Sequence, residues 1–359
     1  MSKKKVLVAM SGGVDSSVAA ALLVDQGYEC VGVTMRISSS VSPIEGARAV
    51  ADALGICLHV FDLRQEFQKE VVEYFATSYM SGQTPNPCVV CNPKIKLGLL
   101  VERAAYLGCD YVATGHYARV FADGERRRWC LAKGIDGSKD QSYYLYGLTQ
   151  AQLARLLLPL GEYTKQEVRS MASDMGLPAA KSEESQDICF LEDDDYRAFL
   201  RRSWPESLRS GLIMDRSGRV LGRHEGLAFY THGQRKGLGI ASREPLYVLE
   251  LDPIRNAVIV GTAPEVYSSA LVAADVNWVS MPEISGPFSV TARVRYRAES
   301  TEAVIERLAD ARVLTVFAKP QRAITPGQSV VWYKEDLVVG GGRIETPLSD
   351  FTPCSATMT

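Results

Sequence analysis

The sequence predicts an α/β N-terminal domain with a doubly wound parallel sheet, followed by a small β-rich central domain and a C-terminal β-barrel. In the first 120 residues, apolar runs alternate with segments of helical pattern, which is typical of a parallel sheet covered by helices. From about residue 211, short strands separated by glycine and proline turns indicate a small β module and then a barrel. We expect four units, at residues 1–205, 206–268, 269–350 and 351–359, the last of them a tail. The regular pattern is expected to end at about residue 346, shortly before that tail.

The individual elements follow from local patterns. The expected strands of the sheet lie at 5–10, 30–35, 57–62 and 111–114, and the expected helices at 16–26, 45–54, 66–79 and 94–107. Gly27, Gly55 and Gly108 follow three of these helices, where a left-handed residue commonly ends a helix. Residues 164–167 (Thr-Lys-Gln-Glu) have the form of a capping box, which predicts a further helix ending near Gly176. Later strands are expected at 289–296, 313–318 and 329–333.

Composition restricts the class of protein. The 359 residues are 46% hydrophobic with a net charge of −2, so any surface for nucleic acid must be local and offset by acidic residues elsewhere. No run of about 18 apolar residues predicts a membrane helix, and the N-terminus has no apolar segment of signal-peptide length. We therefore expect a cytoplasmic protein without membrane contact. Eight cysteines in such a chain indicate chemistry or metal binding rather than a disulfide scaffold.

Residues 6–17 are the most informative stretch, because an apolar strand breaks at Ser11-Gly12-Gly13 and restarts as a helix near Ser16. Backbone N–H groups of such a turn point at one spot beside the positive end of the helix, which makes a phosphate cradle. The Walker ending and the dinucleotide Gly-x-Gly-x-x-Gly pattern are both absent. Ser-Gly-Gly-x-Asp-Ser instead resembles the PP-loop of ATP pyrophosphatases, which split ATP into AMP and pyrophosphate.

The cysteines form two groups. Cys88 and Cys91 fall on an expected loop before the helix at 94, and Cys189 falls in a polar, loop-like segment. A helix N-terminus with Lys94 and Lys96 nearby can stabilise a thiolate. The cysteines expected to be buried filler are Cys30, Cys57, Cys109 and Cys130, and Cys354 lies on the tail. A structural zinc site needs a second Cys or His pair, which the sequence lacks at ligand spacing, so we expect no zinc.

Six motifs in order carry a closer resemblance. They are the PP-loop, Thr-Pro-Asn-Pro-x-x-x-Cys-Asn (84–92), Ala-Thr-Gly-His-Tyr (113–117), Lys-Asp-Gln-Ser-Tyr (139–143), Ser-Gln-Asp-Ile-Cys-Phe (185–190) and Gly-Gln-Arg-Lys-Gly (233–237). Together they resemble the tRNA-specific 2-thiouridylase family from about residue 3 to about residue 345. The resemblance implies a PP-loop (adenine nucleotide α hydrolase-like) fold and ATP-dependent 2-thiolation of the wobble uridine (U34) of tRNA.

The resemblance also implies cofactors and residue roles. ATP with Mg²⁺ would be bound at Ala9, Met10, Ser11, Gly12, Gly13, Val14, Asp15, Ser16, Met35 and Gly115. The uridine C2 oxygen would attack the α-phosphate, because AMP is a far better leaving group than a carbonyl oxygen. Cys189 would then carry a persulfide, with Cys91 as its catalytic partner. The resulting Cys91–Cys189 disulfide requires their Cα atoms to approach within about 7 Å in some state, and a reductant would reset it.

One departure leaves an alternative open. Some family members have Asp where this chain has Cys88, so Cys88, Cys91 and Cys189 could converge as three thiols. Three cysteines that leave one iron open can hold a [4Fe–4S] cluster, through which the same thiolation could run. We expect the persulfide route, with no metal site.

For tRNA, the resemblance implies contacts at Asn86, Pro87, Cys88, His116, Lys139, Asp140, Gln141, Arg295, Tyr296 and Gln328. Period-two alternation predicts Arg293, Arg295 and Arg297 on one strand face, where they suit phosphate oxygens. Further basic residues extend this track: Arg197, Arg201, Arg202, Arg209, Arg235 and Lys236. The implied partners are tRNAs for Lys, Glu and Gln, and a sulfur donor, either a cysteine desulfurase or a sulfur-relay protein.

Two other functions compete. A PP-loop synthetase that adenylates a small carboxylate, such as an amide-forming ligase, needs neither Cys91 nor Cys189. A non-catalytic RNA-binding protein that keeps a nucleotide pocket for regulation is disfavoured by the intact Asp15 and both motif cysteines.

Overall fold

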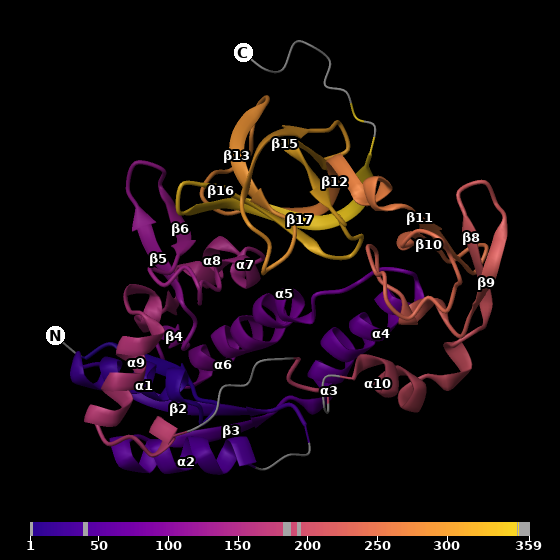
Figure 1. Cartoon of the computed structure of the whole chain (residues 1–359). Helices are drawn as coiled ribbons and strands as arrows, with labels where there is room; N and C mark the ends of the chain where they lie inside the picture. Colours follow the sequence, from indigo (N-terminus) through magenta and orange to yellow (C-terminus); the bar gives the residue numbers. More distant parts are fainter. Residues whose placement is uncertain (1–2, 39–41, 182–187, 192–194, 350, 352–359) are drawn as a thin grey trace.

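The structure is a computed structural model that describes residues 3–38, 42–181, 188–191, 195–349 and 351. Its N-terminal part contains a five-stranded parallel sheet in the order β3-β2-β1-β4-β7, as the alternation predicts. Strands β2, β3 and β4 of this sheet lie in the lower left of Figure 1, below the barrel. The strands are β1 (Lys5–Ala9), β2 (Glu29–Arg36), β3 (Leu58–Asp62), β4 (Tyr111–Ala113) and β7 (Leu156–Leu157). The central strand β1 is apolar and buried because helices cover both faces of the sheet.

The helices that cover the two faces follow the predicted order. The α-helices of this part are α1 (Val14–Asp25), α2 (Ser42–Leu54), α3 (Arg64–Phe67), α4 (Glu73–Met80), α5 (Pro87–Cys91), α6 (Leu100–Tyr106), α7 (Ser142–Leu145), α8 (Gln150–Leu153), α9 (Lys165–Asp174) and α10 (Tyr196–Ser203). Two π-helical segments, η1 (Gln68–Val72) and η2 (Asn92–Leu99), join α3 to α4 and α5 to α6. Short 3₁₀ segments are η3 (Pro159–Glu162), η4 (Pro178–Lys181), η5 (Pro205–Ser207), η6 (Leu227–Phe229) and η7 (Ala263–Val266).

Alternate residues of β1 explain the two-layer covering. Val6 and Val8 pack in one cluster with residues of α1 and α2, whereas Leu7 packs in another with Leu97 and Leu100 of η2 and α6. This alternation is the period of a strand buried on both faces. The expected helices at 66–79 and 94–107 are therefore real, but each is longer than predicted and contains a π-helical segment.

Two β units follow. The middle unit is a four-stranded sheet in the order β10-β11-β8-β9. Its strands are β8 (Gly211–Asp215), β9 (Val220–His224), β10 (Tyr247–Asp252) and β11 (Ala257–Gly261). The C-terminal strands are β12 (Tyr267–Trp278), β13 (Phe288–Arg293), β14 (Thr301–Arg307), β15 (Val313–Arg322), β16 (Ser329–Lys334) and β17 (Leu337–Leu348). Pairing of β12 with β17 closes these six strands into the predicted barrel.

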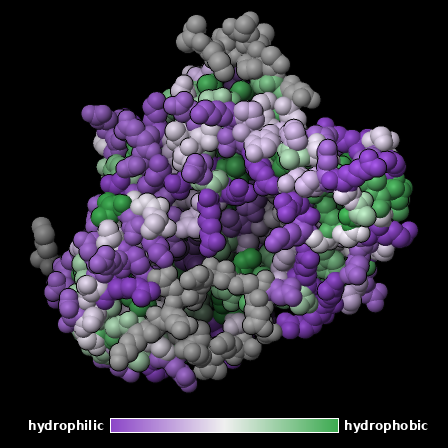
Figure 2. Space-filling model, in the orientation of Figure 1, coloured by the Kyte–Doolittle hydropathy of each residue, from purple (hydrophilic) through white to green (hydrophobic). Residues whose placement is uncertain are grey.

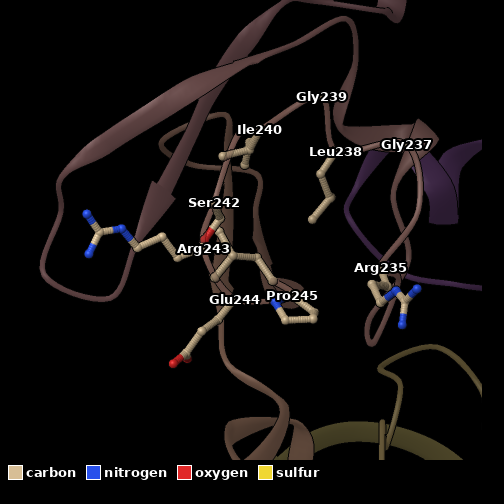
Figure 3. Close-up of a pocket in the computed structure, with 10 residues that line it drawn as sticks. Arg235, Gly237, Leu238, Gly239, Ile240, Ser242, Arg243, Glu244 and Pro245 are labelled. Atoms are coloured by element: carbon tan, nitrogen blue, oxygen red, sulfur yellow. The ribbon is translucent and has the colours of Figure 1, made fainter.

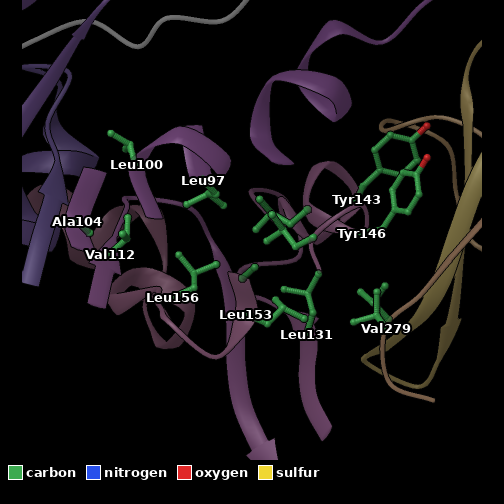
Figure 4. Packing of buried hydrophobic residues seen from close by; sticks show 14 of the residues in the cluster. Leu97, Leu100, Ala104, Val112, Leu131, Tyr143, Tyr146, Leu153, Leu156 and Val279 are labelled. Carbon is green, nitrogen blue, oxygen red and sulfur yellow. The ribbon is translucent and has the colours of Figure 1, made fainter. Parts of the chain in front are cut away.

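An additional hairpin connects the N-terminal part to the barrel. Strands β5 (Ala118–Asp123) and β6 (Arg128–Lys133) leave the N-terminal part and join the barrel sheet, where Ala132 pairs with Leu337 of β17. Tyr143, Tyr146, Leu131 and Val279 then share one buried cluster with the helices below the barrel (Figure 4). Because this core is continuous, the barrel is fixed against the N-terminal part.

Several expectations need correction. The strand expected at 289–296 ends at Arg293, and the last strand continues to Leu348 instead of loosening after residue 346. Cys30, Cys109 and Cys130 are buried as expected, but Cys57 is exposed just before β3. Cys354 and most of the expected tail lie outside the described residues. In the described part of the chain, no helix has both the length and the apolar composition to cross a membrane.

Candidate nucleotide and thiol site

The loop after β1 turns tightly at the predicted glycines. Gly12 has a φ of 80°, and a Cβ there would lie 2.9 Å from the backbone nitrogen of Ala47, so glycine is required. The Ser11 N–H donates to Ser16 Oγ at 3.1 Å, and that hydroxyl donates to the Gly13 carbonyl at 3.1 Å. Helix α1 begins at Val14, two residues before the position expected from sequence.

The other expected ATP-binding residues lie at the same edge. A Cβ on Gly115 would lie 2.8 Å from the backbone nitrogen of Ser16, so the segment after β4 packs directly on the first turn of α1. Val33 of β2 pairs with Ala9, which places Met35 beside the start of the loop. Met10 is buried beneath it. The carboxyl edge of the sheet therefore gathers all ten of these residues.

An ion pair that sequence reasoning missed fixes the loop aspartate. The buried Lys165, at the start of α9, donates from Nζ to Asp15 Oδ1 at 2.7 Å, and the Tyr117 hydroxyl donates to the same oxygen at 2.7 Å. The predicted capping box is present, with Thr164 and Glu167 in mutual contact. That box fixes where α9 begins, but it carries no signal for what Lys165 faces.

Cys88 and Cys91 are helical, contrary to the expected loop. Helix α5 begins at Pro87, whose fixed φ suits a first helical position, and π-helical η2 follows directly after Cys91. π-Helical turns inside α-helices are frequent at functional sites. The cysteines therefore lie on a defined helix rather than on a mobile turn.

Cys189 is brought to this helix by its neighbour. The Phe190 ring packs edge-on against Phe67 at 5.7 Å and Phe75 at 5.2 Å between centroids. Phe190 also joins the buried cluster that contains Cys91. The negative charge of a Cys189 thiolate contributes to the raised pKa of Cys91, after burial as the main cause. These two thiols, which are far apart in sequence, therefore belong to one site. Residues 185–187 of that motif lie outside the described part of the chain, in which the cysteines are free thiols.

The thiols are not readily ionised in this state of the protein, although Lys96 acts on their pKa values in the expected direction. Burial raises the pKa of Cys91 to about 12. Desolvation also raises the pKa of Cys88 and of Cys189, although Cys189 as a whole residue is exposed to solvent. Lys96 lowers each of these pKa values but does not outweigh desolvation. Lys94 does not contribute, because its ammonium pairs with Glu70 at 2.6 Å.

The segment before α5 is held by the barrel. Gln328 donates from Nε2 to the carbonyls of Thr84 and Pro85 at 3.1 and 3.2 Å. The Thr84 N–H donates to the Pro326 carbonyl at 2.9 Å. Gln328, expected to contact tRNA, therefore fixes the backbone that leads into the cysteine helix.

An aromatic pair lies beside Cys88. The rings of Tyr144 and Tyr296 lie 4.4 Å apart between centroids with an interplanar angle of 30°. Asn92 donates from Nδ2 to the Tyr144 carbonyl at 3.2 Å, and its Oδ1 is buried without a hydrogen-bond partner. Burial and, to a smaller extent, the charge of a Cys88 thiolate raise the pKa of Tyr144, so the Cys88 thiol lies close to this pair.

The predicted arginine stripe is wrong, because β13 ends at Arg293 and the chain then turns. The Ala298 N–H donates to the Arg295 carbonyl at 3.1 Å, which closes that turn. Arg295 and Arg297 are exposed, whereas Arg293 is inward and pairs with Asp140 at 3.1 Å.

The remaining expected tRNA contacts differ in accessibility. The Asp140 carboxylate has no exposed surface and accepts from Arg293 and from the Ser142 N–H, so it is not available to contact RNA directly. Gln141 Oε1 accepts from the Tyr117 N–H at 3.0 Å. His116 lies 2.8 Å from Thr114 Oγ1, and burial, with a smaller effect of Lys96, lowers the pKa of His116 to about 3. Its imidazole is therefore neutral. Lys139 is half-buried.

The basic track is only partly free. Arg201 pairs with Glu225 at 2.8 Å, and Arg197 donates to the Phe229 carbonyl at 2.7 Å. Arg235 and Arg243 lie on opposite sides of a hollow of about 470 Å³ in the middle unit (Figure 3). The face shown in Figure 2 is mostly hydrophilic and recedes toward its centre below the barrel.

The thiol group does not form a metal site in this arrangement. Within the residues that the structure describes, no three His, Cys, Asp or Glu side chains are placed to hold a metal ion. The positive charge of Lys96 instead interacts electrostatically with the thiols of all three cysteines. The iron–sulfur alternative therefore stays a prediction.

The sheet and its loop define an α/β protein of the HUP class, and family models cover the chain. The model described as "tRNA methyl transferase HUP domain" matches residues 4–193. The models "tRNA methyl transferase PRC-barrel domain" and "Aminomethyltransferase beta-barrel domain" match 197–262 and 268–344.

Curated relatives are more specific. A tRNA-specific 2-thiouridylase MnmA of Carboxydothermus hydrogenoformans is 49% identical, covering 96% of this chain and 99% of its own. A protein of the same name from Moorella thermoacetica is 51% identical, covering 95% and 99%. The chain therefore belongs to the tRNA-specific 2-thiouridylase family. Among solved structures, a 4-thiouridine synthetase–RNA complex with bound ATP has 19% identity and a TM-score of 0.34, covering 48% of this chain and 41% of that one. That similarity is too distant to support an argument.

Proposed function

We propose that this protein uses ATP to thiolate C2 of the wobble uridine (U34) of tRNA. The observation that carries the proposal is the combination of a phosphate-cradling loop and three converging thiols in one chain. Relatives of nearly equal length named as tRNA-specific 2-thiouridylases support it. The family-model wording "methyl transferase" is less consistent with a site built from thiols.

ATP binds at the carboxyl edge of the sheet, with its phosphates on Ser11 to Ser16 and its adenosine toward Met35 and Gly115. Asp15 is 35% exposed and would offer a carboxylate oxygen to Mg²⁺, which one or two carboxylates commonly hold together with substrate phosphates. Bound Mg²⁺ would neutralise phosphate charge as pyrophosphate leaves. Lys165 and Tyr117 hold Asp15 in one orientation. The uridine C2 oxygen attacks the α-phosphate, which forms an adenylated base and releases pyrophosphate.

Sulfur transfer then uses the thiol group. Cys189 carries a persulfide made by a cysteine desulfurase or a sulfur-relay protein. The Cys91 thiolate attacks the Cys189 sulfur, the persulfide S–S bond breaks, and a Cys91–Cys189 disulfide forms. The sulfide released adds to C2, and AMP leaves with the former C2 oxygen. A dithiol reductant then returns both cysteines to thiols.

The base reaches this site by leaving the anticodon stack. Asn86, Pro87 and Cys88 surround it beside the Tyr144–Tyr296 pair, whose faces suit stacking with a base. Exposed Arg295 and Arg297 contact backbone phosphates. His116, Lys139 and Gln141 are further proposed tRNA contacts. We propose tRNAs for Lys, Glu and Gln as substrates.

The test is mass spectrometry of nucleosides from tRNA incubated with the protein, ATP and a sulfur source. Gain of one sulfur at the wobble uridine is expected. If Cys91→Ser and Cys189→Ser both keep full turnover, the amide-forming synthetase is favoured instead. We expect a colourless protein that is active without iron, and a brown anaerobic preparation whose activity tracks its iron content would contradict the persulfide route.

A further inference from the structure

Lys96 is a charged residue that the steps above do not use. It lies on η2, five residues after Cys91, and in a π-helix residues five apart are hydrogen-bonded neighbours on successive turns. The backbone amide of Lys96 has a small lowering effect on the pKa of Cys91, in keeping with this neighbouring position. Its sequence neighbours Ile95 and Leu97 are 1% exposed, so the backbone that carries Lys96 is held firmly by the core.

The groups that face Lys96 come from three segments of the chain. They are Cys88 and Cys91 on α5, Cys189 beside Phe190, and the neutral imidazole of His116 after β4. Tyr144 also lies near this site, because its hydroxyl interacts electrostatically with the Cys88 thiol. Among these neighbours, the sulfurs are the groups that become anionic during thiol–disulfide chemistry.

Lys94 provides a built-in comparison. It lies two residues from Lys96 on the same π-helical segment, but its ammonium pairs with Glu70 at 2.6 Å and its side chain is 56% exposed. Lys94 is thus neutralised at the surface, whereas Lys96 is half-buried on the same segment, five residues after the buried Cys91. Lys94 and Lys96 therefore differ in their surroundings although both lie on the segment Asn92–Leu99.

A sulfur anion is unfavourable in these surroundings unless a cation offsets its burial. Thiol–disulfide chemistry needs that anion, since the thiolate and not the thiol is the nucleophile. Phe190 and Ile95 provide an apolar wall, and Cys91 is 5% exposed. We propose that Lys96 stabilises the anionic sulfur formed on Cys91 and Cys189 during sulfur transfer, a role that rests on the proposed function of the site.

The direct test is the pH dependence of alkylation at each cysteine, read by peptide mass spectrometry after brief exposure to iodoacetamide. In Lys96→Met, the profiles of Cys91 and Cys189 move to higher pH. Because only the thiolate reacts, a thiol pKa higher by about one lowers the alkylation rate about tenfold at a pH below that pKa. Lys94→Met keeps the wild-type profile, and Lys96→Arg, which keeps the charge, stays near it. Equal profiles for Lys96→Met and Lys94→Met would overturn the proposal.

Two further readouts separate this role from others. Lys96→Met should keep tRNA-stimulated ATP–pyrophosphate exchange and tRNA affinity while losing thiolation, because adenylation does not use a sulfur anion. A fall in tRNA affinity with unchanged alkylation would make Lys96 an RNA contact and refute the inference. Should wild-type protein transfer no sulfur to tRNA, the proposed function fails, while the alkylation profiles still decide the role of Lys96. Should Lys96→Met not fold, Lys96→Gln and Lys96→Arg give the same comparison.

Discussion

Gln328 offers a way to test whether the barrel holds the cysteine helix in place. Its amide donates to two carbonyls of the segment that leads into α5, at 3.1 and 3.2 Å, and both contacts are partly buried. A hydrogen bond of this kind contributes about 1 kcal/mol net. Gln328→Ala should therefore lower the free energy of opening this segment by about 1–2 kcal/mol, which is a factor of roughly 5–30 in the open population.

The assay is amide hydrogen exchange of Thr84, whose N–H donates to Pro326 at 2.9 Å and is protected only while the segment stays closed. Its exchange should accelerate by that factor in Gln328→Ala, with a matching rise in alkylation of Cys88. Gln321→Ala is the control, since this glutamine contacts Thr301 and Lys319 elsewhere on the barrel. Unchanged Thr84 exchange, with weaker tRNA binding alone, would show that Gln328 acts only as an RNA contact.

Three other predictions follow from single contacts. Arg293→Met leaves the Asp140 carboxylate buried without its cation, so urea unfolding should show a free energy of unfolding lower by about 3–5 kcal/mol. Adding Asp140→Asn should recover part of that loss. A loss below about 1 kcal/mol would contradict a structural role for the pair. Arg295→Ala should weaken tRNA binding and reduce the salt slope by about 1, with ATP binding unchanged; an identical slope removes this residue from the interface. In the folded protein the pKa of His116 is lowered to about 3, whereas in the unfolded chain it is about 6.5. Below a pH of about 6.5 the unfolded chain therefore binds a proton that the folded protein does not. The free energy of unfolding should fall as pH drops, by up to about 1.4 kcal/mol per pH unit. His116→Gln should remove that contribution while His59→Gln keeps it, and equal slopes in all three proteins would show that His116 is not buried neutral.

Local patterns predicted much of the fold. The apolar runs of the sheet and the capping box at Thr164 each depend on residues close in sequence, so their signals were visible. The helix that begins at Pro87 was missed because Pro and Asn in 84–87 are also typical of a loop. The arginine alternation continued past Arg293, but β13 pairs with β16 only up to that residue, so the backbone leaves the sheet there.

The contacts that organise the candidate site join positions far apart in the chain. Lys165 reaches Asp15, and Gln328 reaches Thr84. No periodicity or spacing marks such pairs. Likewise, the cysteine motifs indicated thiol chemistry, but burial decided the direction in which the pKa of Cys91 moves, and burial is a property of the folded chain.

The most direct test of the account compares Cys91→Ser, Cys189→Ser and Cys130→Ser in two assays with tRNA. ATP–pyrophosphate exchange should persist in all three proteins, because adenylation needs the loop at Ser11 and not the thiols. Sulfur in the wobble uridine should disappear in the first two and remain in Cys130→Ser, whose thiol is buried in β6. Full thiolation by Cys91→Ser or Cys189→Ser would contradict the claim that this thiol pair transfers the sulfur.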